Sequence, residues 1–401
     1  MPRLSRIFII PLLCIFISSF PVQGTYNPFN SMQVKTPSGP ASAAIYKKRR
    51  AVKQLLEGLR NRNGFPGAVA GVCLEDGASF AVAVGYADRD RKTPMRPGDL
   101  LHAGSAGKTF FAALALQLVA QGRLSLDDKI LRYLSSENWF AQLPNAKDIT
   151  VRMLLNHTSG IPEYGESFMR DLVQEPSKPR SPLDAVKSVL GAKPVNAAGA
   201  AFSYTDVNYQ LLGFVIERVT GRRAYRDIQQ RILAPLGLKR IIPADRPRIA
   251  GLVPGYAGAK NPFGGDRMLV GGALVLDPRF EWGGGGFVTN AEDLACWLAA
   301  FSTGRAFDSR LLPEVLATVE ATGLGQGARS GLGIEVEDSP LGKAYGHGGY
   351  FPGYFTQAYW YPAKRIAVAV QINTSDESLV KQSLKEMVNE LTGAVLTDQV
   401  R

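Results

Sequence analysis

The chain has 401 residues, of which 45% are hydrophobic and 20% charged, a composition typical of a soluble globular protein with a full hydrophobic core. Its formal net charge is +11, but the Lys and Arg residues are dispersed, and no basic block with interleaved aromatic residues occurs. The charge alone therefore leaves attraction to an anionic envelope polymer open, whereas nucleic-acid binding has no motif to support it.

The first residues have the pattern of an export signal. Arg3 and Arg6 precede a mostly apolar stretch from Ile7 to Phe20, and the small-residue site Val22-Gln23-Gly24 follows. We predict a cleaved signal peptide over residues 1–24 and a periplasmic or secreted product. An uncleaved membrane anchor is the alternative, but the stretch is short for a bilayer span and a proline interrupts it, so no stable membrane span is expected after cleavage.

Residues 25–41 carry Asn, Pro, Ser and Gly without periodicity, which predicts a linker. A single domain is expected over residues 42–401. It begins with a predicted helix and a hairpin of two strands, at residues 42–62, 67–74 and 78–86. The next apolar run, Phe110 to Val119, predicts a buried helix that Gly122 ends.

The middle of the domain, about residues 125–240, is predicted to be a mostly helical subdomain, in which a helix from Asp206 to Thr220 is closed by Gly221. A Gly- and Pro-rich stretch follows, ending in Gly283 to Gly286. The last part returns to strands, expected at residues 331–337, 344–346, 355–361 and 366–374, before a helix at about 377–391. Strands at both ends predict an α+β fold: one antiparallel sheet built from both chain ends, flanked by helices, with the helical region inserted.

Three cysteines occur, and Cys14 lies in the predicted signal. Cys73 and Cys296 each lie in an apolar run, so we predict two buried free thiols; a disulfide between them stays open, because an export compartment permits one. No two of the histidines have metal-ligand spacing, and we predict no metal and no cofactor; the three are His102, His157 and His347.

A Ser-x-x-Lys quartet opens the predicted helix that follows residue 104. Ser105 and Lys108 lie one turn apart on one helical face, which would let the amine reach the hydroxyl. A serine becomes a good nucleophile when a neighbouring base takes its proton. The quartet alone is weak evidence, because chance produces about one or two in a chain of this length. A second one, Ser378 to Lys381, lies in a charged segment that predicts a solvated helix.

Two further stretches give the first quartet its context: Phe202 to Tyr209, which contains Tyr204-Thr205-Asp206, and Tyr345-Gly346-His347-Gly348-Gly349-Tyr350. Together the three stretches resemble, in order and spacing, the motifs of the serine β-lactamase and penicillin-recognising superfamily. The resemblance covers roughly residues 45–392. It is strongest to the branch of class C β-lactamases, D-alanyl-D-alanine carboxypeptidases and family VIII esterases, and it implies their β-lactamase/transpeptidase-like fold.

The resemblance implies a role for each matched residue. Ser105 would be the nucleophile, and Lys108 and Tyr204 would share the proton relay. The backbone N–H groups of Ser105 and Tyr350 would form the oxyanion hole. Gly348 and Gly349 would let a substrate backbone approach the edge strand. Taken alone, a tyrosine before a helix is more often a packed aromatic, and only the other two motifs favour the catalytic role.

The chain departs from the family pattern at Asp206, where an asparagine is usual. An amide can donate a hydrogen bond to a substrate carbonyl, whereas a carboxylate only accepts one. Asp206 would also pair with Lys108 and oppose a neutral lysine, which shifts the base role toward Tyr204.

The histidines receive separate predictions. His347 stands where β-lactamases usually carry lysine, and there it would offer a titratable donor to a substrate carboxylate. His157 is predicted to tie loops together by hydrogen bonds. His102 is predicted to pack beside the nucleophile helix.

These features predict an exported serine hydrolase that forms an acyl-enzyme on Ser105 and acts on a small-molecule, peptide or peptidoglycan-derived substrate. We favour a D-alanyl-D-alanine carboxypeptidase-like or D-amino-acid peptidase activity. An esterase is the first alternative and a β-lactamase the second. A protein of another class, a penicillin- or wall-binding protein without useful turnover or an inactive scaffold, also remains open.

Overall fold

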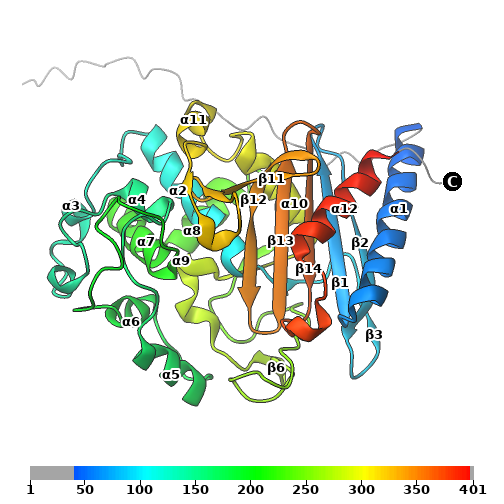
Figure 1. Ribbon diagram of the computed structural model, residues 1–401, viewed down its shortest axis with the longest axis horizontal. Coiled ribbons are helices and arrows are strands. Elements are labelled where there is room, and N and C mark those ends of the chain that lie inside the picture. The colour runs from blue at the N-terminus through cyan, green and yellow to red at the C-terminus, as the bar shows by residue number, and fades with distance from the viewer. Residues whose placement is uncertain (1–39, 398–401) are drawn as a thin grey trace, which may run out of the picture.

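A nine-stranded antiparallel sheet forms the centre of the computed structural model, which describes residues 40–397 (Figure 1). The strand order is β3-β2-β1-β14-β13-β12-β11-β10-β9, so strands from both chain ends pair side by side at β1 and β14. Their bounds are β1 Gly67–Leu74, β2 Ser79–Asp88, β3 Thr93–Pro94, β9 Val319–Glu320, β10 Arg329–Ser330, β11 Glu335–Ser339, β12 Gly342–Phe351, β13 Tyr354–Tyr361 and β14 Ile366–Ile372. The predicted fold class is confirmed.

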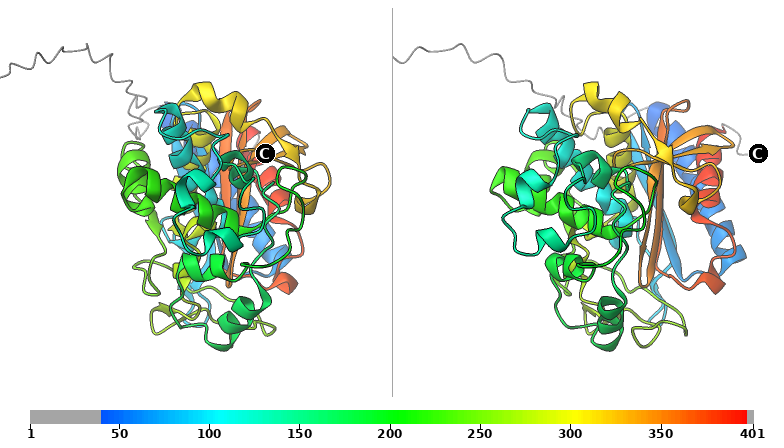
Figure 2. Two further views of the ribbon diagram at one scale, coloured as in Figure 1. Left: turned by 90° about the vertical axis from the view of Figure 1, so that its left-hand side faces the viewer. Right: turned by 60° about the vertical axis from the view of Figure 1, so that its left-hand side comes forward.

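Helices cover both faces of this sheet, as Figure 2 shows with the sheet nearly edge-on. α1 (Pro40–Asn63) and α12 (Leu384–Leu396) pack on one face, and α10 (Ala291–Ser302) packs against β1 and β14 on the other. Because both faces are covered, β14 is buried throughout and its residues are apolar except for Gln371. Alternate residues of β1 enter two separate apolar clusters, with Val69 on the α10 side and Val72 on the α1 side.

The inserted helical region lies beyond α10, on the left in Figure 1. α7 (Asp206–Thr220) runs through it with the predicted bounds, because Thr205 caps its first turn and Gly221 ends it at a φ of 68°. The other helices in this part are α2 Lys108–Ala120, α3 Leu131–Leu134, α4 Val151–Leu155, α5 Glu166–Gln174, α6 Pro182–Lys187, α8 Ala224–Ile228 and α9 Trp282–Gly285, and α11 Leu312–Val315 follows α10. Short strands join the region to the sheet: β4 Leu101–His102, β5 Ile241–Pro243 and β8 Phe287–Thr289 form one small sheet, and β6 Leu269–Val270 pairs with β7 Ala273–Leu274.

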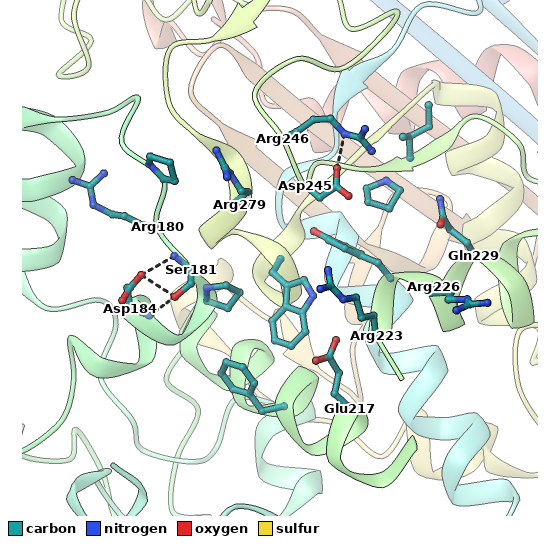
Figure 3. A pocket seen from close by; sticks show the side chains of 17 residues that line it. Arg180, Ser181, Asp184, Glu217, Arg223, Arg226, Gln229, Asp245, Arg246 and Arg279 are labelled. Atoms are coloured by element: carbon teal, nitrogen blue, oxygen red, sulfur yellow. Dashed lines mark hydrogen bonds and ion pairs between the residues drawn. The ribbon is translucent and has the colours of Figure 1, made fainter. Parts of the chain in front are cut away.

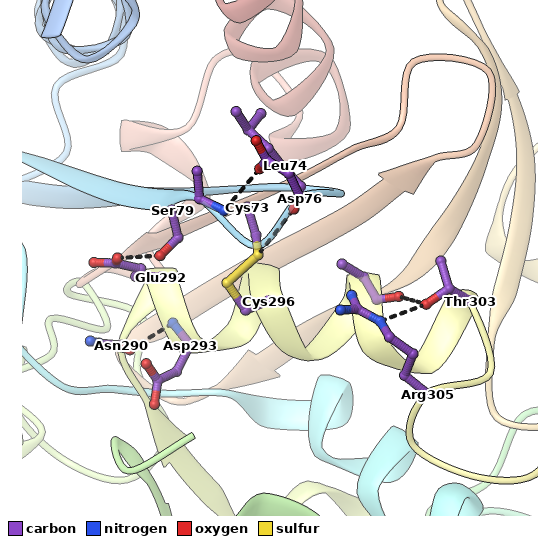
Figure 4. The surroundings of a disulfide bond; sticks show 12 residues. Cys73, Leu74, Asp76, Ser79, Asn290, Glu292, Asp293, Cys296, Thr303 and Arg305 are labelled. Atoms are coloured by element: carbon purple, nitrogen blue, oxygen red, sulfur yellow. Dashed lines mark hydrogen bonds between the residues drawn. A yellow bond between two sulfur atoms is a disulfide. The ribbon is translucent and has the colours of Figure 1, made fainter. Parts of the chain in front are cut away.

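A disulfide joins Cys73 of β1 to Cys296 of α10 (Figure 4). The prediction of two free thiols is therefore wrong. Each cysteine lies in an apolar run, which also suits a buried thiol, and only the packing of α10 across β1 brings the two Cα atoms to 5.0 Å. The bond closes a loop of 223 residues and ties the first strand of the sheet to the helix that separates it from the inserted region.

Two other elements, the C-terminal helix and β12, have boundaries that differ from the predictions. The C-terminal helix begins at Leu384 and not at residue 377, because Ser383 and Glu386 form a capping box there. Ser378 and Lys381 consequently lie in a 3₁₀ turn and a loop, not in a helix. β12 is ten residues long, whereas its glycines had limited the predicted strand to three.

The predicted signal peptide and most of the predicted linker lie outside the described residues, and the last two linker residues, Pro40 and Ala41, belong to α1. Within residues 40–397, no helix is both long enough and apolar enough to cross a bilayer.

Candidate active site

Ser105 lies in a 3₁₀ turn, Gly104–Gly107, that leads directly into α2. The turn packs against β12 so closely that a Cβ atom on Gly104 would lie 2.4 Å from the backbone N of Tyr350. Gly104 also has a φ of 54°, a conformation that glycine adopts without strain. The nucleophile candidate is therefore held against the edge of the sheet by a backbone contact that tolerates no side chain.

Lys108 is fully buried, and three acceptors surround its ammonium group. Nζ donates to Ser105 Oγ at 2.9 Å and to the carbonyl oxygen of Gly284, and it forms an ion pair with the carboxylate of Asp206. The two hydrogen bonds that Nζ donates and its contact with a carboxylate are those of a protonated lysine. The expected pairing of Lys108 with Asp206 is present, and this geometry is that of a charged lysine oriented toward the serine.

Tyr204 lies over the same lysine, with its ring centroid 4.9 Å from Nζ. The ring of His157 stacks on that of Tyr204 at 4.3 Å between ring centroids. Burial raises the pKa of Tyr204 well above its ordinary value and the charge of Asp206 adds to this rise, while the interaction with the Ser105 hydroxyl acts in the opposite direction. The phenol is therefore neutral before substrate binds.

Asp206 begins α7, so its backbone N–H is one of those that the helix itself leaves unpaired. The carboxylate of Glu163 accepts this N–H at 2.9 Å. Burial raises the pKa of Glu163 to about 7, with a further contribution from the charge of Asp206. Burial likewise raises the pKa of Glu281 to about 8. Lys108 is thus set among carboxyl groups.

β12 supplies an open edge beside the nucleophile. β11 pairs with β12 only as far as Gly346, so within residues 40–397 no strand pairs with β12 on that side from His347 onward. Phe351 and Tyr354 close a two-residue hairpin, and in an antiparallel ladder the next pair, Tyr350 and Phe355, points its backbone groups outward. The N–H of Tyr350 is therefore available beside Ser105, as an oxyanion hole requires.

His347 is buried, and its Nδ1 lies 2.6 Å from the carbonyl oxygen of Gly348. Because a carbonyl only accepts, Nδ1 carries the proton, and Nε2 of the neutral ring is an acceptor. Glu335 Oε1 lies 3.5 Å from Nδ1. Burial lowers the pKa of His347, and the charge of Glu335 opposes this change. The structure thus places His347 on the edge strand but pairs it within the protein, which weakens its predicted role as a donor to a carboxylate.

A cavity of about 780 Å³ opens over this arrangement, lined by Ser105, Tyr204, Glu335, His347 and Tyr350 together with residues of β13 and of the segment before α12. The structure thus brings the candidate nucleophile Ser105, Tyr204 and the edge strand to one opening, and Lys108 contacts Ser105 without lining the cavity itself.

The remaining two histidines have structural surroundings. His157 accepts from the N–H of Thr205 at 3.3 Å and ties its loop to α7, in line with its prediction. His102 accepts from the N–H of Gly104 at 3.0 Å and stacks on Phe351, and burial lowers its pKa to about 3. It supports the nucleophile turn as well as packing beside it.

Sequence reasoning missed several groups of the site: the carboxyls of Glu163, Glu281 and Glu335, and the carbonyl of Gly284. The three glutamates belong to none of the motifs. Gly284 lies in a run of four glycines that is visible in the sequence, and the close approach of Gly285 to Gly104 and Ser105 explains why that run lacks side chains.

Residues 49–386 match the protein family described as Beta-lactamase. The chain belongs to the beta-lactamase family. The chain is similar to a D-aminopeptidase of Brucella anthropi, with 26% identity over 342 residues that cover 84% of this chain and 61% of the relative. Esterase EstB of Burkholderia gladioli is 27% identical over 314 residues, covering 72% of this chain and 76% of the esterase.

Solved structures show the same fold. D-amino acid amidase from Ochrobactrum anthropi SV3, in complex with L-phenylalanine amide, superposes with a TM-score of 0.74 at 25% identity, covering 87% of this chain and 97% of that one. A D-stereospecific amidohydrolase from Streptomyces sp. gives 0.70 at 26% identity, covering 83% and 97%. This chain spans about three fifths of the length of the curated D-aminopeptidases that it matches. The family and the constellation are those of a serine hydrolase.

Proposed function

We propose that this chain is an exported serine hydrolase that cleaves amide bonds of D-amino-acid amides or peptides through an acyl-enzyme on Ser105. The observation that carries the proposal is the contact of 2.9 Å between Lys108 Nζ and Ser105 Oγ beneath an open strand edge. The names of the relatives, a D-aminopeptidase and a D-amino acid amidase, support the substrate class.

In the proposed reaction, the ammonium of Lys108 first passes one proton to the carboxylate of Asp206, which leaves a neutral amine beside Ser105. Ser105 Oγ then attacks the substrate carbonyl, and its proton passes to this amine, directly or through the hydroxyl of Tyr204. The N–H groups of Ser105 and Tyr350 hold the oxyanion. Collapse of the tetrahedral intermediate breaks the C–N bond, and the relayed proton leaves with the amine. Water then attacks the ester carbonyl on Ser105 and gives its proton to the amine of Lys108. Ser105 Oγ is now the leaving group and takes that proton back.

The charges around the cavity favour a substrate with a free ammonium group over one with a terminal carboxylate. Of the residues that line the cavity in the described chain, Lys385 alone has a permanent positive charge, and its ammonium pairs with Glu337. His347 is neutral, and Glu335 lies beside it. Carboxypeptidase action would leave the terminal carboxylate of its substrate without a cation, whereas Glu335 would attract an amino group.

Ester hydrolysis is the second candidate, because esterase EstB is a relative and an ester is the easier acyl donor for the same nucleophile. A panel of D-phenylalanine amide, its N-acetyl derivative, D-alanyl-D-alanine and a p-nitrophenyl ester separates these activities. We expect the free amine to be cleaved faster than the N-acetyl amide. Preference for D-alanyl-D-alanine would overturn the charge argument, and turnover of the ester alone would leave esterase as the function.

Export is part of the proposal. The signal-like residues 1–24 support it, and so does the Cys73–Cys296 disulfide, since such bonds persist in oxidising compartments. The mature N-terminus should lie near Thr25. N-terminal sequencing of the protein purified from the cell envelope or medium tests this, and finding Met1 there would contradict cleavage.

A further inference from the structure

A second cavity lies in the helical region and has a volume of about 790 Å³, close to that of the catalytic cavity (Figure 3). Its walls come from α6, α7 and α8, from the chain after β5, and from the segment that leads into α9. The two cavities have no lining residue in common within residues 40–397. Nothing in the proposed hydrolysis uses this second space.

The floor of the cavity is aromatic. Trp282 is buried, Phe214 and Tyr225 are half-buried, and the Phe214 and Trp282 rings lie 5.1 Å apart between centroids. Aromatic faces of this kind bury a flat apolar group well, at a gain of roughly 25 cal/mol for each Å² removed from water. The floor therefore suits a ligand with an aromatic or similarly flat body.

Arginines surround this floor and outnumber the acidic residues, five to three: Arg180, Arg223, Arg226, Arg246 and Arg279 against Asp184, Glu217 and Asp245. Arg180 donates to three backbone carbonyls, and Arg246 and Arg279 pair with aspartates. The guanidinium groups of Arg223 and Arg226 make no hydrogen bond or ion pair with any other residue in the described part of the chain. Two cations thus remain available at the mouth of the cavity.

We propose that this cavity is a second binding site, which takes an acidic ligand, a carboxylate or a phosphate, attached to a flat apolar body. Guanidinium groups bind both anions through paired N–H donors, and the excess of positive charge attracts either. The aromatic floor accommodates the rest of the molecule. A smaller cavity of about 570 Å³ shares Phe214, Glu217 and Arg223 with this one, so a longer ligand could extend past Arg223.

The position of the site connects it with catalysis. Trp282 has a φ of 27°, a strained value for a residue with a side chain, and it begins the glycine segment whose Gly284 carbonyl accepts from Lys108. Tyr225 donates its hydroxyl proton to the carbonyl of Gly286 at 2.8 Å, at the other end of this segment. A ligand in the cavity would contact the two residues that hold the segment in place.

The test measures binding by calorimetry to the mature protein, with Ser105 free or blocked by a fluorophosphonate. The probes are 1-naphthyl phosphate and 1-naphthoate, with neutral 1-naphthamide as their matched control. We expect one molecule of an anionic probe to bind with equal affinity to free and blocked protein, and at least about tenfold more tightly than the amide. Binding of the phosphate, the carboxylate or both identifies the acidic group preferred. Binding should weaken as salt is raised.

Arg223→Gln and Arg226→Gln should each weaken anion binding by about three- to tenfold. Folding should be unaffected, because neither guanidinium makes a hydrogen bond or an ion pair in the described part of the chain, and Arg223 acts on Glu217 only through its charge. Arg49→Gln, on the exposed surface of α1, is the control and should change nothing. The proposal is overturned if neither anion binds, if the amide binds equally well, if blocking Ser105 abolishes binding, or if both cavity variants bind like the control.

Discussion

Gly349 on β12 allows a sharp test of how the edge strand serves the nucleophile. A Cβ atom on Gly349 would lie 1.9 Å from the carbonyl oxygen of Ala103 and 3.3 Å from the N of Ala106. Both are backbone atoms of the chain around Ser105. In the Gly349→Ala variant, strand and turn would have to separate by about 1.5 Å to reach ordinary van der Waals contact, which displaces the Tyr350 N–H from the oxyanion position.

A displacement of about 1 Å at a catalytic group can cost about 100-fold in rate, so we expect the acylation of Ser105 in Gly349→Ala to slow by about that factor. Overpacking should also lower the free energy of unfolding by about 1–3 kcal/mol. Gly393→Ala, on α12, is the control, because its Cβ would meet nothing within 4 Å and it does not line the catalytic cavity. Its acylation should stay within about threefold of wild type.

Stopped-flow acylation by a chromogenic ester, together with urea unfolding, gives both quantities. The result that would refute the reasoning is a Gly349→Ala protein that is folded and acylates as fast as Gly393→Ala. Such a result would mean that the turn and the strand move together, and that the close contact does not fix the oxyanion hole.

Four further outcomes follow from the same geometry. Ser105→Ala should abolish hydrolysis in a folded protein, whereas Ser378→Ala should leave the rate unchanged within about twofold, as a spectrophotometric assay will reveal. Asp206→Asn should shift the acidic limb of the pH–acylation profile to lower pH and raise amide turnover relative to ester turnover. If the limb does not move and the ratio does not change, Asp206 takes no part in acylation. The free energy of unfolding should fall as pH rises from about 4.5 to about 7, because the buried carboxyl of Glu163 binds its proton more tightly in the folded than in the unfolded chain. Urea titrations at several pH values measure this dependence, and Glu163→Gln should make it weaker. Cys73→Ser should lower the free energy of unfolding by about 2–5 kcal/mol, and equal stability of the two proteins under oxidising conditions would contradict a structural disulfide.

The sequence predicted best those features whose signals are local. The bounds of α7 follow from a threonine cap at Thr205 and a glycine at position 221. The pairing of strands from both chain ends followed from the apolar runs at either end and was confirmed at β1 and β14.

Features that depend on distant packing could not be predicted in this way. Cys73 and Cys296 meet only because α10 lies across β1, and no local pattern at either cysteine records that contact. Glu335 is placed beside His347 by the register of β11 against β12, which the sequence does not fix. The length of β12 was underestimated because glycine weakens a strand, although here the glycines let the strand approach the nucleophile turn.

Asp206 connects the selection of a substrate with the activation of the nucleophile. Its carboxylate holds the ammonium of Lys108 in a position to donate to Ser105, so the serine is oriented before it is deprotonated. An amide at this position would donate to a substrate carbonyl, and its replacement by a carboxylate removes that donor. The substrate carbonyl thus loses a hydrogen bond at this position. A positive charge on the substrate would compensate for that loss through attraction to the carboxylates of Asp206 and Glu335. One departure from the family motif would therefore account both for a charged resting lysine and for the proposed preference for substrates that carry an amino group.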